Sequence, residues 1–430
     1  MVERNPRANP EKLSGVQNGA RQTAVSPPPP AGSTLTLGEY IKWHRVRRGM
    51  TQEVLAGLVG GRTADWLGKV ERGSIVIDRL SVLEQLADAL RIPLARLIDR
   101  ARTWSPTAPA HGLDIDPLRH VLADYTYLTS DQDSDHIDLD VLAAEIGETW
   151  SAYQDSRYAR ANRLLPAAIV RARAASQAIE GHARLRAQRR LAMAYQGAAM
   201  LLTKIGETDL AWLAADRGLG KAFEADDKIV LGSLYRSVAH CLLANKNLDA
   251  ATATVDNAAA LLATDAHRGP DHLSIHGSLF LVGAMAAARV GDRREASRYL
   301  AHAQRAADRL GHDGNNMWTA FGPTTVRMHH VSAALELGDI ETALAQGERI
   351  DTSALPVERR VRHKLDLARA HNARGHRDTA EALLLDANEL APEQVTSHYI
   401  TAALLTTWAR APRETPNPHI VQLADKARIV

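Results

Sequence analysis

Apolar residues recur at helical spacing in the first hundred residues. The spacing predicts a helix from Leu37 to Arg48, where Gly49 supplies the left-handed residue that closes it. Thr51 and Thr63 are expected to cap the next two helices, because a threonine hydroxyl accepts from the free amides of a first turn. The core positions of these helices, and of two further amphipathic helices after them, are Leu55, Ala56, Val59, Leu67, Val70, Leu80, Leu83, Leu86, Ala87, Leu90, Leu94, Leu97 and Ile98.

From Leu139 onward the chain is rich in Ala and Leu, and one local pattern returns along it. A small or polar turn residue is followed five positions later by Ala, with an apolar-periodic helix on each side. A glycine at the turn ends one helix, and the small Ala lets the next helix pack closely. The pattern predicts antiparallel helix pairs stacked into a solenoid with a concave face. Its positions are Ser156 and Ala161, Gly206 and Ala211, Asn245 and Ala250, Gly291 and Ala296, Gly338 and Ala343, and Gly375 and Ala380.

Two breaks divide the chain into predicted regions. Residues 1–33 contain Pro27 to Pro30 and little apolar content, which is typical of a disordered tail. Residues 101–117 contain Pro106, Pro109 and Gly112 and are expected to be a linker. We therefore expect an all-α protein with one domain over residues 36–100, a helical repeat domain over residues 118–412 and a C-terminal tail over residues 413–430.

Charge is distributed unevenly, although the formal net charge is only +2. Residues 36–102 carry 12 Lys and Arg against 8 Asp and Glu, whereas the residues after 102 carry 36 against 40. The basic excess near the N-terminus suits a nucleic-acid partner there. The single cysteine, Cys241, excludes an intramolecular disulfide, and no run approaches about eighteen consecutive apolar residues. We expect a cytoplasmic protein that does not associate with membranes.

The stretch from Arg45 to Gly73, RVRRGMTQEVLAGLVGGRTADWLGKVERG, resembles the helix-turn-helix of the Cro/C1 (Xre-type) repressor family. The resemblance extends from Thr36 to Ile98 and implies a five-helix domain whose third helix enters the major groove of DNA. The repeats resemble a tetratricopeptide-type array. The combination is similar to peptide-pheromone-responsive regulators of bacteria, in which such an array holds the ligand.

Alignment with the family assigns DNA contacts to the start of the third helix and to the cations around it. Lys69 can donate to guanine, and Asp65 can accept from cytosine. Arg45 and Glu71 match a structural salt bridge of the family, and losing either partner would strand a buried charge. The base-reading candidates are Thr63, Ala64, Asp65, Trp66 and Lys69, and the backbone-contacting candidates are Gln52, Arg47, Arg48, Arg62 and Arg72.

Three features leave alternatives open. Trp66 suits either a cover over the core or a wedge between base steps. Asp65 would repel phosphate unless it reads a base or pairs with Arg62. The second glycine of Gly60-Gly61 makes the turn one residue longer than is usual in the family, so the third helix is rotated or the extra residue bulges outward.

The repeat region offers little catalytic or metal-binding chemistry. His272 and His276 lie one helical turn apart, but Leu273 replaces the Glu of a metalloprotease-like HExxH motif and no third ligand is evident. No Ser/His/Asp or Cys/His arrangement can be inferred, and no Gly-rich phosphate loop follows a strand. We expect no metal, no cofactor and no enzyme activity.

The leading hypothesis is a transcription regulator that binds operator DNA as a homodimer. Its repeat domain would sense a peptide, protein or small-molecule ligand and set the dimer geometry. The alternative is an interaction scaffold or adaptor whose helix-turn-helix no longer binds specific DNA. Ala64, Asp65 and Gly68 at reader positions favour this alternative.

Overall fold

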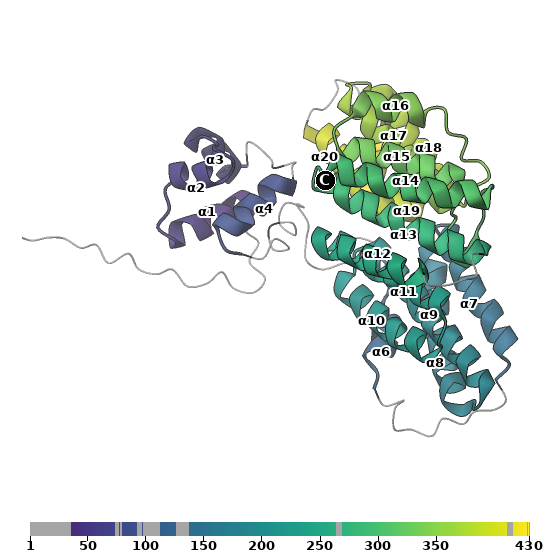
Figure 1. The fold of residues 1–430 in the computed structure, drawn as a ribbon. Helices are drawn as coiled ribbons and strands as arrows, with labels where there is room; N and C mark the ends of the chain where they lie inside the picture. The colour runs from purple at the N-terminus through teal and green to yellow at the C-terminus, as the bar shows by residue number, and fades with distance from the viewer. Residues whose placement is uncertain are drawn as a thin grey trace, which may run out of the picture. The chain divides into compact units, whose positions relative to one another are not determined.

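The computed structural model describes residues 36–73, 77, 80–92, 97, 112–125, 137–263, 269–410, 416–427 and 429. Across these residues it is helical and contains no strand, which confirms the predicted all-α class. The predicted tail over residues 1–33 and most of the predicted linker lie outside the described residues. The chain divides into two compact units, residues 1–104 and residues 105–430, called here the N-terminal unit and the repeat unit (Figure 1).

Local sequence sets the beginnings of the first three helices of the N-terminal unit. Thr36, Thr51 and Thr63 each precede a helix, and each hydroxyl accepts from the main-chain amide three residues further on. Glu39 completes a capping box with Thr36. Of the fifth predicted helix, Leu97 is described, and it is buried in the core of the unit. The helices are α1 (Leu37–Arg47), α2 (Gln52–Leu58), α3 (Ala64–Glu71) and α4 (Leu80–Ala89).

The turn between α2 and α3 contains both glycines in the left-handed region. Gly60 and Gly61 have φ angles of 65° and 69°. The amide of Gly61 donates to the Gly57 carbonyl at 3.2 Å, and that of Arg62 donates to the Ala56 carbonyl at 3.0 Å. The longer turn is therefore closed by main-chain hydrogen bonds to the end of α2.

The repeat unit stacks helices joined by short turns into six successive pairs (Figure 1). Its core is rich in Ala and Leu side chains, and larger aromatic side chains fill the spaces between them. The pairs are α7 (Leu139–Gln154) with α8 (Tyr158–Ala178), α9 (His182–Ile205) with α10 (Thr208–Glu224), α11 (Lys228–Ala244) with α12 (Leu248–Ala263), α13 (Pro270–Arg289) with α14 (Arg293–Leu310), α15 (Pro323–Glu336) with α16 (Ile340–Gly347), and α17 (Val357–Ala373) with α18 (Arg377–Leu390).

Five of the six expected turns occur at the expected residue. Ser156, Gly206, Gly291, Gly338 and Gly375 have positive φ angles, and the Ala five positions after each is buried. The third turn differs by one residue, because Asn245 continues the helix as its C-cap with φ −82°. Lys246 instead takes the left-handed conformation at φ 60°, and Ala251 rather than Ala250 is fully buried.

In the described part of the repeat unit, four further helices accompany the six pairs. Helix α6 (Asp116–Ala123) begins in the last residues of the predicted linker. The predicted C-terminal tail contains α21 (Pro418–Lys426), whose Ile420 and Leu423 are buried in the core formed with α17 and α18. Between the pairs and α21 lie α19 (Pro392–Ser397) and α20 (Tyr399–Arg410).

The first and last parts of the repeat unit contact each other. The Ser156 hydroxyl donates to Gln394 Oε1 at 2.6 Å, and the Ala159 amide donates to Glu393 Oε2 at 2.7 Å. Lys204, at the end of α9, forms an ion pair with Glu358 at the start of α17. The stack of pairs therefore closes on itself, with α19 against α8 and α17 against α7.

The connection between α14 and α15, residues 311–322, packs against several pairs. It includes the short helix η2 (Asn316–Trp318), and Trp318 stacks on Trp150 of α7 with ring centroids 5.4 Å apart. Asn315 and Gln154 exchange side-chain hydrogen bonds of 2.8 Å. These contacts hold Met317 and Trp318 at positive φ angles that non-glycine residues rarely adopt.

Candidate nucleic-acid interface

The candidate base-reading side chains lie at the N-cap and in the first turn of α3, with Lys69 in its last turn. Thr63, Asp65 and Lys69 are exposed, whereas Ala64 and Trp66 are half-buried. Thr63 caps the helix by accepting from the Trp66 amide at 3.2 Å. Lys69 Nζ lies 2.8 Å from Asp65 Oδ2, one helical turn away. The exposed face of α3 therefore carries a paired cation and anion.

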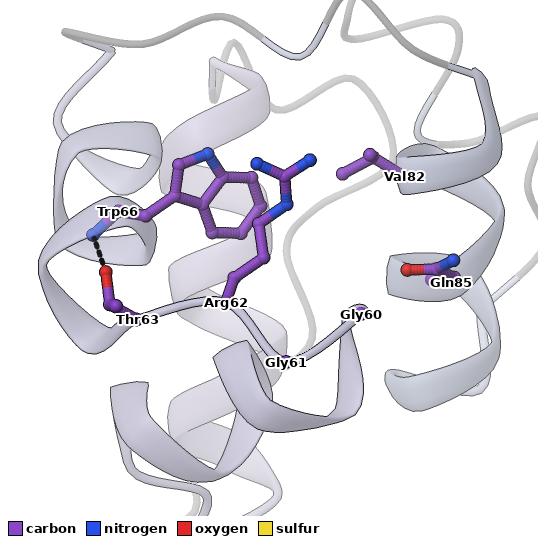
Figure 2. A pocket seen from close by; sticks show the side chains of 7 residues that line it. All are labelled: Gly60, Gly61, Arg62, Thr63, Trp66, Val82 and Gln85. Atoms are coloured by element: carbon purple, nitrogen blue, oxygen red, sulfur yellow. Dashed lines mark hydrogen bonds between the residues drawn. The ribbon is translucent and has the colours of Figure 1, made fainter.

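Arg62 covers Trp66. Its guanidinium carbon lies 4.6 Å from the centre of the Trp66 ring, in cation–π geometry. Figure 2 shows the guanidinium beside the indole, at a shallow hollow that Val82 and Gln85 of α4 line from the other side. The indole also packs against the core of the unit. Trp66 thus lies as a cover over the core, and Asp65 pairs with Lys69 rather than with Arg62.

A buried ion pair connects α1 to α3. Arg45 Nε lies 2.5 Å from Glu71 Oε1, and Arg45 Nη2 lies 3.0 Å from Glu71 Oε2. Arg45 Nη1 also donates to the Met50 carbonyl at 2.8 Å, and Gln52 Nε2 donates to Glu71 Oε2 at 2.8 Å. The bidentate geometry fixes the angle of α3 and ties the start of α2 to the same carboxylate.

The other candidate backbone contacts lie at the ends of α1 and α3. Arg47 is exposed and lies over Trp43 of its own helix. Arg48 is also exposed and donates to the Arg91 carbonyl at 3.2 Å. Arg72 is the exposed C-cap residue of α3. Arginines at helix ends suit phosphate contacts because the guanidinium offers several donors.

Gly38 contributes to the placement of α3, although the sequence pattern did not indicate this. A Cβ at this position would lie 2.4 Å from the Val70 carbonyl oxygen and 2.7 Å from that of Glu71. Glycine therefore permits α1 to cross closely over the end of α3. A single glycine in a helical pattern gives no signal of which backbone it approaches.

His272 and His276, the two histidines one helical turn apart, make contacts other than metal coordination. His272 and His276 stack with ring centroids 5.5 Å apart, and His272 Nε2 lies 2.9 Å from the Leu262 carbonyl oxygen. Within the described ranges, no group of three or more His, Cys, Asp or Glu side chains is arranged to hold a metal ion. None of the helices described is both long and apolar enough to span a bilayer.

Residues 36–98 match the family model of the helix-turn-helix domain, which confirms the predicted domain at this position. Among solved structures, the chain is similar to Bacillus thuringiensis PlcR in complex with the peptide PapR7 and DNA. The two chains are 13% identical, with a TM-score of 0.27, over 64% of this chain and 95% of PlcR. No curated protein matches the chain.

Proposed function

We propose that the chain is a cytoplasmic, sequence-specific transcription regulator of the Xre (Cro/C1) type. Its N-terminal unit binds operator DNA as a homodimer. Within its repeat unit, residues 118–412 form a tetratricopeptide-like array that senses a peptide, protein or small-molecule ligand and sets the spacing of the two recognition helices. This role requires no catalysis, metal or cofactor.

The main observation that supports this proposal is the exposed start of α3. A helix fits the major groove, where each base pair presents a distinct pattern of donors and acceptors. Thr63 and Asp65 lie at that exposed start, and Lys69 lies one turn after Asp65 on the same helix. The Arg45–Glu71 ion pair holds the helix in a fixed orientation. Arg62 and Arg72 lie at its two ends and suit the flanking phosphates.

Selection from a random duplex library with the full chain tests the proposal. We expect an enriched palindromic site, bound with an affinity that falls as salt rises, because DNA binding releases counterions. Lys69→Ala should change the preferred base at one position by about 1–3 kcal/mol. Arg48→Ala should weaken binding to all duplexes and reduce the salt dependence.

The matched control is Arg305→Ala, which removes an exposed arginine from α14 of the repeat unit. It should bind the selected duplex as the wild type does. No enriched sequence would reject the regulator. Equal loss of affinity in the Lys69 and Arg305 variants would reject the assigned base-reading register.

The second candidate function is a protein-interaction adaptor. The Asp65–Lys69 pair favours it, because the pair neutralises the exposed cation on the face of α3. Under this alternative the selection returns no site, while partner proteins bind the repeat unit equally well in the wild type and in the Lys69 variant.

A further inference from the structure

Arg236 is a buried cation whose Nε has no hydrogen-bond partner among the described residues. It lies in the middle of α11 and is 2% exposed. Its Nε is enclosed by protein and has no hydrogen-bond partner. Across the described part of the chain, its side chain takes part in no ion pair. Burying an unpaired charge is costly, and an unsatisfied buried group calls for an explanation such as an ion that binds there.

Two charged residues at the start of α17, Glu358 and Arg359, act electrostatically on Arg236. Glu358 forms an ion pair with Lys204 and lies 3.6 Å from Arg359, measured from Oε2 to Nε. Arg359 also donates to the Thr319 carbonyl at 3.3 Å. The Glu358 carboxylate is thus shared by two other cations, and Arg236 is left without a carboxylate at ion-pair distance.

The balance of charge around Arg236 is positive. The three cations Lys204, Arg236 and Arg359 all act on His240 of α11, and Glu358 is shared between Lys204 and Arg359.

Burial is the main cause of two lowered pKa values here, and neighbouring positive charges add to it. Burial and the positive charge of Arg359 lower the pKa of Arg236 to about 10, against the opposing effects of Tyr153 and Glu358. Burial, followed by the charges of Arg236, Arg359 and Lys204, lowers the pKa of His240 well below its usual range. His240 therefore stays neutral at pH 7 and adds no charge to the cluster.

We propose that the interior of the repeat unit binds an anionic group, a carboxylate or a phosphate, between Arg236 of α11 and Arg359 of α17. The planar guanidinium matches both groups in bidentate geometry. The anion would connect the third pair to the sixth and stabilise the closed stack. The inference deepens the proposed function, since it names the ligand chemistry, and it rests on that function for the effect of the ligand on DNA binding.

Thermal unfolding of the full chain without DNA tests the site. Inorganic phosphate and succinate are titrated separately at constant ionic strength, into the wild type, Arg236→Met, Arg236→Lys and the surface control Arg305→Met. We expect a saturable rise in Tm in the wild type and in the control. The apparent affinity should fall at least tenfold in Arg236→Met and less in Arg236→Lys.

A response to phosphate alone assigns a phosphate group, and a response to succinate alone assigns a carboxylate. The absence of saturable stabilisation of the wild type by either anion would overturn the site. An equal response in Arg236→Met would also overturn it and would place the anion elsewhere, such as on the DNA-binding surface. Since the titration contains no DNA, its failure leaves the outcome of the duplex selection unaffected.

In the absence of anion, Arg236→Met should unfold at the same temperature as the wild type or higher, because methionine removes a charge that has no partner. A purely structural arginine predicts the opposite, a lower Tm for Arg236→Met together with no anion response in the wild type. If Arg236→Met does not fold, Arg236→Lys compared with Arg305→Met locates the site, because an anion bound at Arg236 loses affinity in the first variant and not in the second.

Discussion

One carboxylate holds α3 in place. The buried Glu71 carboxylate accepts hydrogen bonds from both Arg45 and Gln52. The bidentate Arg45 balances its charge, and Gln52 supplies a further donor. Buried ion pairs contribute little compared with apolar replacements of the same size, but breaking one is strongly destabilising. The value of the pair lies in the orientation it gives to α3.

Glu71→Ala should therefore destabilise the N-terminal unit by about 3–5 kcal/mol, because it leaves the Arg45 charge buried and unpaired. Hydrogen exchange of the α1 and α3 amides in the full chain measures the change. The double variant Arg45→Met, Glu71→Met should recover much of the loss. Glu53→Ala, which removes an exposed acid from α2, should change the exchange by less than about 0.5 kcal/mol. A Glu71 variant as stable as the Glu53 variant would contradict this role.

His329 of α15 should make the repeat unit sensitive to acid. Burial lowers its pKa to about 4, and the charges of Arg359 and Arg362 act in the same direction, against Asp366 and a hydrogen bond to the Thr325 carbonyl. The unfolded chain takes up a proton near pH 6.5 and the folded chain does not. Stability is therefore complete above about pH 6.5 and falls as the pH drops from there toward 4.

Between pH 7.5 and 5.5 the contribution of His329 to this loss is about 1 kcal/mol. Urea denaturation at the two pH values should show a smaller difference for His329→Asn, whose amide can still donate to a carbonyl. His419→Asn, at an exposed position on α21, should keep the wild-type difference. Identical pH dependence in the wild type and the His329 variant would show that this side chain does not titrate as described.

At the scale of elements, the sequence predicted most of the helix caps and turns, because these depend on neighbouring residues. Threonine caps and the spacing of turn residue and Ala depend on neighbouring residues, and they occur where the pattern indicated. Lys246 departs from the pattern because the helix before it extends one residue further. The Arg62–Trp66 contact and the Asp65–Lys69 pair escaped prediction, since several partners were available to each side chain and the fold selects one.

Two glycine variants test whether α1 and α3 cross closely at Gly38. Gly38→Ala should destabilise the N-terminal unit by about 1–3 kcal/mol, because the new methyl group meets backbone that cannot move away easily. Gly57→Ala, within α2, meets no atom within 4 Å and should stabilise the unit by about 0.5–1 kcal/mol. Thermal unfolding of both variants decides the matter, and equal shifts would show that α1 and α3 do not cross closely at Gly38.

At the scale of the whole repeat unit, closure changes how stability is distributed. Open arrays are stabilised by contacts between adjacent repeats, so damage stays local. Here Gln394 of α19 contacts Ser156 and the Glu358 carbonyl, which are far away in the sequence. The sequence pattern contained no signal for this closure or for the cation cluster around Arg236, because both depend on the curvature accumulated over six pairs.

Gln394→Ala should therefore loosen the start of α8 as well as α19, with an increase in hydrogen exchange that corresponds to about 1–3 kcal/mol. Glu389→Ala, at an exposed position on α18, is the control and should leave α8 unchanged. If Gln394→Ala affects α18 to α20 alone, the array behaves as an open one.

Closure also constrains how this protein can change during evolution. An open array tolerates the gain or loss of one unit, because a new unit repeats the contacts of its neighbours. In this chain, a duplicated or deleted helix pair would move Gln394 and Glu393 away from Ser156 and Ala159 by the full width of a pair. The number of pairs is therefore fixed, and diversity among its descendants should arise from substitutions on the inner helices rather than from changes in length.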